Sequence, residues 1–396
     1  MITLKGNVHY VGVNDRAKTL FEGLWPLPYG VTYNSYLIAD EKVALIDTVD
    51  VNFFDLFIEK VREVIGKRPI DYLVINHMEP DHSGSIRLLR QFYPNITLVS
   101  NKKALDMVEG FYGAGAQTRA INEGDTLELG HHKLRFHMIP MVHWPETMVS
   151  YDLTDHILFS GDAFGSFGAL NGTPVDTHMD TTLYWSEMER YYANIVGKYG
   201  APVQKALQKL DGVFIEMICS THGPVWTGEN VAKVVGVYDR LSRYATEEGV
   251  VIAYGSMYGN TQQMAEAIAE ELSVQGIRKI VLHDVSRVNH SYILADLFRY
   301  KGIILGAPTY NASIYPQMEM LMSEIEMRDM KDHYLGYFGS FSWASHAVKR
   351  LAAFSEKVKF EVVGDPVEMK QGMKEGVRVA CQGLAKAMAD RLKADR

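Results

Sequence analysis

The sequence INHMEPDHSGSI, residues 75–86, places two histidines and two carboxylates within six positions. It begins inside the apolar run IDYLVIN (residues 70–76), which predicts a buried strand that ends at Asn76. Side chains alternate along an extended segment, so His77, Glu79 and Asp81 share one side and His82 points elsewhere. Loops at strand ends often hold functional side chains. We therefore expect this stretch to bind metal, with enough ligands to serve two ions.

Three later residues extend this candidate ligand set. His143 in MVHWPE, Asp162 in FSGDAFG and His222 in CSTHGP each follow an apolar strand candidate. The ordered set resembles the metallo-β-lactamase superfamily, in which a strand-end His-rich motif and later His, Asp and His residues bind two metals. The resemblance covers most of residues 1–248. Asp162 is the natural bridge, because a carboxylate has two oxygens and can contact both ions of a pair.

One position departs from that superfamily. Its hydrolases usually carry His-x-His-x-Asp-His, whereas Glu79 stands here in place of the second histidine. A carboxylate is a harder and negatively charged ligand, so the exchange favours iron over zinc.

The alternative for these residues is a structural role. Asp81 and Ser83 are candidates for capping the helix that follows the strand. Outside the set, His131, His132 and His137 lie in a turn or a strand-like run, and we expect them to be surface or core histidines.

The second half of the chain has a different organisation. VVIAYGS, beginning at Val250, predicts a strand, and the amphipathic stretch QQMAEAIAEELSVQG predicts a helix closed by Gly276. Two further strand-then-loop units follow, each succeeded by a helical pattern. We predict an α/β chain in which residues 1–248 form a metallo-β-lactamase-like αββα sandwich and residues 249–396 form a flavodoxin-like doubly wound parallel sheet.

The first loop of the second half has the features of an anion-binding loop. It is rich in small or hydroxyl residues and leads into a helix, whose N-terminus attracts negative charge. The pattern Ser-x-x-Gly-x-Thr resembles the phosphate loop of flavodoxins, which bind FMN, and neither a nucleoside-triphosphate loop nor a dinucleotide fingerprint is present. Its residues are Ser256, Met257, Tyr258, Gly259, Asn260 and Thr261.

Two later loops fall where flavodoxins surround the flavin ring, and Tyr310 and Trp343 are the aromatic residues expected to flank it. These loops comprise Pro308, Thr309, Tyr310 and Asn311, and then Ser340, Phe341, Ser342, Trp343 and Ala344. The alternative for the two aromatic residues is plain packing in the domain.

A site of this kind followed by a flavodoxin unit resembles the flavodiiron proteins, over nearly the whole chain. The resemblance implies His77, Glu79 and His143 on one iron, Asp81, His82 and His222 on the other, and Asp162 between them. It also implies reduction of oxygen to water or of nitric oxide to nitrous oxide, with FMN passing electrons to the irons. Either Tyr191 or Tyr192 is expected to reach the metal pocket.

The same resemblance implies a head-to-tail homodimer, or a dimer of such dimers, in which the FMN of one chain meets the irons of the other. The chain has no rubredoxin-type cysteine motif, which is similar to the two-domain class that takes electrons from rubredoxin or another small reduced donor. Many relatives have Phe-His-Gly where this chain has Phe21-Glu22-Gly23. That difference leaves the choice between oxygen and nitric oxide open.

Composition excludes several other classes. The formal net charge is −8 and there is no basic tract, so we expect no nucleic-acid partner. There is no signal-peptide pattern and no apolar run long enough to span a bilayer, so we expect a cytoplasmic protein with no membrane partner. Two other functions remain open: a zinc hydrolase fused to a flavodoxin module, and an FMN electron carrier whose metal domain is inactive.

Overall fold

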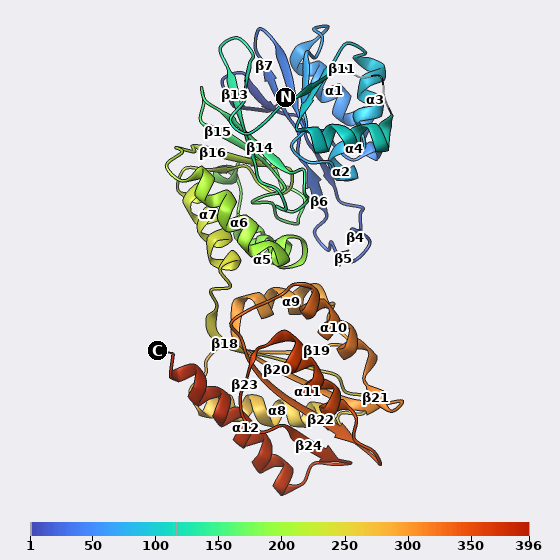
Figure 1. Cartoon of the computed structure of the whole chain (residues 1–396), viewed down its shortest axis with the longest axis vertical. Coiled ribbons are helices and arrows are strands. Elements are labelled where there is room, and N and C mark those ends of the chain that lie inside the picture. Colours follow the sequence, from blue (N-terminus) through green and yellow to red (C-terminus); the bar gives the residue numbers. More distant parts are fainter. Residues whose placement is uncertain (1, 114, 116, 396) are drawn as a thin grey trace. The chain divides into compact units, whose positions relative to one another are not determined.

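The computed structural model describes residues 2–113, 115 and 117–395. Contacts divide the chain into two compact units, Met1–Ser242 and Arg243–Arg396 (Figure 1). The boundary expected from the sequence, between residues 248 and 249, lies slightly after this one in the chain, inside β18 (Glu247–Tyr254).

The first sheet of the N-terminal unit has seven strands in the order β1-β2-β7-β8-β9-β10-β11. Neighbours from β1 to β8 pair antiparallel, and those from β8 to β11 pair parallel. The strands are β1 (Ile2–Lys5), β2 (Val8–Tyr10), β7 (Tyr36–Ala39), β8 (Val43–Ile46), β9 (Tyr72–Val74), β10 (Thr97–Ser100) and β11 (Gln117–Ala120).

The second sheet has six strands in the order β12-β13-β14-β15-β16-β17. Only β15 and β16 pair parallel among the described strands of this sheet. The strands are β12 (Thr126–Glu128), β13 (Lys133–Met138), β14 (Met148–Asp152), β15 (Ile157–Gly161), β16 (Met217–Ser220) and β17 (Trp226–Thr227). Two short ribbons complete the unit: β3 (Val13–Asp15) with β6 (Val31–Tyr33), and β4 (Leu20–Phe21) with β5 (Trp25–Pro26).

Helices cover the outer faces of the two sheets, which makes the four-layer sandwich predicted from the sequence (Figure 1). Beside the first sheet lie α1 (Phe54–Ile65), α2 (Pro80–Ser83), α3 (Ile86–Phe92) and α4 (Lys102–Tyr112), and beside the second lie α5 (Thr182–Tyr191), α6 (Gly200–Leu210) and α7 (Glu229–Ser242). The sequence pattern predicts a helical stretch from about Leu183 to Leu210, but a π-helical turn, Tyr192–Val196, and a 3₁₀ turn, Gly197–Tyr199, separate α5 from α6.

The C-terminal unit is the predicted doubly wound sheet. Its parallel strands run in the order β19-β18-β20-β22, with β23 and β24 both on the outer side of β22, and β21 pairs antiparallel with β20. The strands are β18, β19 (Ile280–Asp284), β20 (Tyr300–Tyr310), β21 (Ser313–Ile314), β22 (Tyr334–Phe341), β23 (Glu361–Val362) and β24 (Val367–Lys370). The helices are α8 (Asn260–Val274), α9 (His290–Arg299), α10 (Pro316–Met327), α11 (Ala347–Val358) and α12 (Glu375–Lys393).

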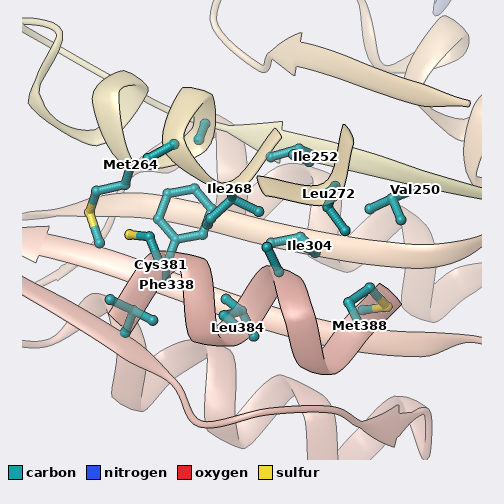
Figure 2. Close-up of a cluster of buried hydrophobic side chains, with 14 of the residues drawn as sticks. Val250, Ile252, Met264, Ile268, Leu272, Ile304, Phe338, Cys381, Leu384 and Met388 are labelled. Atoms are coloured by element: carbon teal, nitrogen blue, oxygen red, sulfur yellow. The ribbon is translucent and has the colours of Figure 1, made fainter. Parts of the chain in front are cut away.

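One face of this sheet is buried beneath α8 and α12. Figure 2 shows Ile268 and Leu272 of α8 and Leu384 and Met388 of α12 meeting over the strands. Near the carboxyl ends of the strands, Phe338 of β22 fills the core between the sheet and these helices, and it is fully buried. The core therefore fixes the strand ends from which the three predicted loops emerge.

Gly306 makes room for that phenylalanine. Gly306 and Phe338 are register partners on neighbouring strands, and a Cβ added at Gly306 would lie 2.0 Å from Cζ of the phenyl ring. Only a residue without a side chain allows the ring to lie across the strand here.

None of the helices within the described residues is both long enough and apolar enough to cross a membrane.

We expect Gly306→Ala to lower the free energy of unfolding of the C-terminal unit by about 1–3 kcal/mol, because the new methyl group overpacks a filled core. Chemical denaturation of the whole chain, followed by a probe in this unit, measures the change. Gly383→Ala in α12 is the matched control, because a Cβ added there meets nothing within 4 Å. In a helix interior that change should raise stability by roughly 0.5–1 kcal/mol. Similar effects of the two substitutions would contradict the role given to Gly306.

Candidate metal centre and flavin pocket

The predicted metal ligands come from strand ends of both sheets of the N-terminal unit. His77 and Glu79 follow β9, whereas Asp81 and His82 lie in the first turn of α2. Asp162 directly follows β15 of the second sheet. His222 follows β16, and His143 lies in the connection between β13 and β14. A hydrogen bond from the Met148 amide to the Asn76 carbonyl, 3.0 Å, joins the two sheets beside these residues.

The structure brings all seven side chains together in two buried groups. Within each group, one ligand atom per residue lies within 4.8 Å of the others. The first group is His77, Glu79, His143 and Asp162, and the second is Asp81, His82 and His222.

The carboxylate of Asp162 lies between the two groups. Its Oδ2 is 3.0 Å from His143 Nε2 and 3.6 Å from His77 Nε2. Its Oδ1 is 2.9 Å from His82 Nε2 and 3.8 Å from His222 Nε2. Each oxygen thus faces one group, which is the arrangement that a carboxylate bridging two metal ions requires.

The other two carboxylates each belong to one group. Glu79 Oε2 lies 3.1 Å from His143 Nε2 and 3.4 Å from His77 Nε2. Asp81 places its two oxygens 3.3 Å from His82 Nε2 and 3.5 Å from His222 Nε2.

Several of these buried atoms have no hydrogen-bond partner among the described residues. They are Nε2 of His77, both carboxylate oxygens of Asp81, both ring nitrogens of His82 and Nε2 of His222. Leaving buried polar groups unsatisfied is costly, and native proteins pair nearly all of them. Metal ions accept imidazole nitrogens and carboxylate oxygens, so this donor set fits a pair of them.

Although burial opposes it, neighbouring carboxylates raise the pKa of His77, His82 and His143, and burial shifts the pKa of two other ligand groups. It lowers the pKa of His222 to about 4, with a further contribution from the neighbouring His82. It raises the pKa of Asp81 to about 7. His222 is therefore neutral near pH 7, which is the form of imidazole that binds metal.

The C-terminal unit contains a cavity of about 700 Å³ at the carboxyl ends of its strands. All fifteen predicted flavin-binding residues line it except Gly259, whose positive φ of 87° forms the turn before α8. Sequence reasoning missed four others, Ala312, His346, Gln371 and Gly372, of which the last two follow β24, a strand that was not predicted. None of the described lining residues is Asp, Glu, Lys or Arg.

Hydrogen bonds connect the loops around this cavity. The Thr261 and Ser340 hydroxyls lie 2.8 Å apart and join the first loop to the third. Thr309 Oγ1 accepts from the amides of His346 and Ala347, at 3.0 and 3.1 Å, and so joins the second loop to the start of α11. The cavity is held open by its own residues, with the N-terminus of α8 beside the first loop to attract a phosphate.

Comparisons with known proteins match both units of the chain. A family described as ODP family beta lactamase matches residues 31–223, and the flavodoxin family matches residues 252–393. An anaerobic nitric oxide reductase flavorubredoxin from Vibrio vulnificus is 34% identical over 91% of this chain and 74% of its own length. The solved structure of rubredoxin oxygen:oxidoreductase from Desulfovibrio gigas is 30% identical, covers 98% of this chain and 97% of its own, and has a TM-score of 0.94. A flavodiiron protein from Giardia intestinalis is 26% identical, covers 98% and 95%, and has a TM-score of 0.93.

This chain belongs to the flavodiiron protein family. It is therefore an oxidoreductase, and its cofactors are FMN and a pair of iron ions. The resemblance inferred from the sequence and the two-domain fold class are both confirmed.

The residues that orient the predicted metal ligands were not found from the sequence. Glu146 Oε1 lies 2.8 Å from His77 Nδ1, and the same oxygen accepts the Met78 amide at 3.0 Å. His222 Nδ1 donates to the carbonyl of Thr32, 2.6 Å away. Such partners fix which ring nitrogen faces the metal. Nothing in the sequence distinguishes Glu146 from the other acidic residues in loops.

His82 differs from these two histidines. Its Nδ1 has no hydrogen-bond partner among the described residues, so its ring lacks the outer anchor that His77 and His222 have.

The two predicted tyrosines take different positions at the junction of α5 with the π-helical turn. The ring of Tyr191 lies 5.6 Å from that of His222, and its hydroxyl is buried without a partner within the described residues. Tyr192 packs edge-on against Tyr238 of α7 at 5.0 Å. Tyr191 is thus the tyrosine that borders the ligand groups, and its participation in catalysis stays a prediction.

Glu22 occupies the tip of the β4–β5 ribbon. Its backbone has a φ of 51°, and the indole of Trp25 donates to its carboxylate at 3.1 Å. Burial raises the pKa of Glu22, and the charge of nearby Glu79 raises it further. The preceding residue, Phe21, lies 5.2 Å from the His222 ring, which places this ribbon against the ligand groups.

We expect Glu146→Gln to weaken iron binding by roughly 10–100-fold, because a neutral amide oxygen is a weaker acceptor than a carboxylate for the proton on His77 Nδ1. Competition with a chelator, followed by elemental analysis, measures the change. Glu123→Gln is the matched control: Glu123 also contacts a histidine Nδ1, that of His137 at 2.8 Å, and a backbone amide, but at an exposed position. Equal iron loss in both variants would show that Glu146 has no special role.

We expect Thr309→Val to weaken FMN binding several-fold, because the amides at the start of α11 lose their acceptor and the loops separate. Fluorescence titration of flavin-free protein with FMN measures the dissociation constant. Thr309→Ser keeps the hydroxyl and should restore the affinity. If the valine and serine variants bind FMN equally well, the hydroxyl does not organise the cavity.

Proposed function

We propose that this protein reduces oxygen to water or nitric oxide to nitrous oxide at its diiron centre, with FMN relaying electrons from rubredoxin or another small reduced donor. The observation that supports this most strongly is the position of Asp162, whose two oxygens each face one buried ligand group. The named activities of the flavorubredoxin and the rubredoxin oxygen:oxidoreductase supply the two substrates. The proposed enzyme works in the cytoplasm, where such carriers are available.

In this proposal, His77, Glu79 and His143 would hold one iron, Asp81, His82 and His222 would hold the other, and Asp162 would serve both. The bound irons would supply redox chemistry for a diatomic substrate, and FMN would supply electrons one at a time. Glu146 and the Thr32 carbonyl keep two of the histidines in the tautomer that presents Nε2. Burial of all seven side chains excludes bulk water from the site.

The loops around the C-terminal cavity bind FMN in this proposal. Residues 256–261 and the start of α8 hold the phosphate, and Tyr310 and Trp343 flank the ring. Trp343 is 90% exposed although it lines the cavity, so the flavin edge can be reached from outside this unit. That exposure supports a head-to-tail homodimer, or a dimer of dimers, in which the FMN of one chain serves the irons of its partner.

The decisive experiment is the cofactor content of protein expressed with ample iron and purified without oxygen. About two irons and one FMN per chain are expected, followed by consumption of oxygen or nitric oxide with a reduced donor. Two zinc ions taken up under iron-rich conditions would instead support a hydrolase. Flavin without metal would leave an electron carrier.

We expect Glu79→His to raise the ratio of bound zinc to iron and to lower the rate of oxygen reduction, because imidazole is the softer ligand. Elemental analysis and an oxygen electrode measure the two changes. Glu79→Asp is the control, since it keeps a carboxylate at this position. Unchanged oxygen turnover in the histidine variant would refute the role given to Glu79.

A further inference from the structure

A second cavity, of about 370 Å³, lies in the N-terminal unit between the end of α6 and the start of α7 and opens to solvent beside the exposed Phe214. Its walls are mainly apolar, and among the described lining residues Asp211 is the only charged one. The helices contribute Leu207, Leu210, Val231 and Val235. The innermost apolar residue of the wall is Phe164, which is buried and lies two positions after Asp162.

The lining continues along α7 toward the metal ligands. Val231, Val235 and Tyr238 are spaced four and three residues apart, so they share one face of the helix. Tyr238 is buried, and its ring lies 4.7 Å from that of Phe164. The apolar face of α7 therefore leads from the cavity to the segment that carries Asp162.

The segment that carries Asp162 and Phe164 lies directly beside the predicted metal ligands. A Cβ added at Gly165, the residue after Phe164, would lie 3.4 Å from Cε1 of Tyr191 and 3.5 Å from the Cβ of His222. Phe164 thus faces the cavity while the next residue touches the residues that surround the metal position.

The apolar lining determines which kind of molecule can occupy the cavity. Apolar walls of leucine, valine and phenylalanine favour small apolar molecules and gases such as xenon. Donors, nucleotides and peptides are charged or large and find few polar partners here. Oxygen and nitric oxide are small and nearly apolar.

We propose that this cavity is a binding site and access route for the diatomic substrate, through which gas reaches the diiron centre along Phe164 and Tyr238. The identity of the gas, oxygen or nitric oxide, rests on the proposed function. The gas passes between apolar side chains, and no bond forms or breaks on the way.

The first test uses xenon as a probe on crystals of the holoprotein. Xenon should occupy the cavity in the wild type and should be lost in Val235→Phe, whose larger ring fills it. Val237→Phe, on the same helix but outside the lining, is the matched control and should leave the xenon in place. Absence of xenon from the wild-type cavity would overturn the proposal.

The second test follows the rate at which nitric oxide binds to the anaerobically reduced holoprotein in a stopped-flow instrument. Val235→Phe should slow binding several-fold with unchanged iron and FMN content, and Val237→Phe should not. Ala232→Phe, which fills the cavity from another position of the lining, should reproduce the effect if Val235→Phe folds poorly. An unchanged rate in a folded filled variant would also overturn the proposal.

Neither test requires turnover, so failure of the proposed function can be distinguished from failure of the access route. A wild type that takes up xenon and binds nitric oxide but reduces neither gas would contradict the proposed reductase activity and leave the access route standing.

Discussion

The arrangement of the N-terminal unit depends on one buried carboxylate. Asp162 is fully buried and faces both ligand groups, and the hydroxyl of Thr221 donates to its Oδ1 at 2.6 Å. Burying a charged group is costly unless it is paired, so histidines from strand ends of both sheets must reach this carboxylate together. The two sheets therefore share one polar centre, and a shift of either sheet would disturb both groups.

The same requirement explains the residues around the ligands. Asp47 accepts the Asn76 amide at 2.7 Å and its side-chain nitrogen at 3.1 Å, which fixes the end of β9 just before His77. Burial raises the pKa of Asp47 to about 6. Its positive φ of 52° places this carboxylate in an uncommon backbone conformation, of the kind that clusters near functional sites.

Sequence patterns are most informative where the chemistry follows a strand. The ligands predicted around Asp162 come from the ends of apolar runs, and the flavin loops end strands of a parallel sheet, so local pattern and position agree. Such patterns do not reveal Glu146 and the Thr32 carbonyl, because the roles of these two groups arise from contacts between distant segments. The π-helical turn after Tyr191 was missed because the apolar pattern continues through it. Gln371 was missed because β24 is short and follows an irregular segment.

The uncharged lining of the flavin cavity has an electrostatic consequence. FMN carries a phosphate dianion, yet no Lys or Arg of the described residues lines the cavity. Hydroxyls, amides and the positive end of α8 must hold that charge, and these are fixed dipoles rather than mobile ions. Attraction between full charges at a protein surface is screened by salt, whereas short hydrogen bonds from a closed loop are screened far less. The flavin should therefore remain bound across a wide range of ionic strength, whereas docking of the proposed electron donor, if it is charged, should weaken as salt rises.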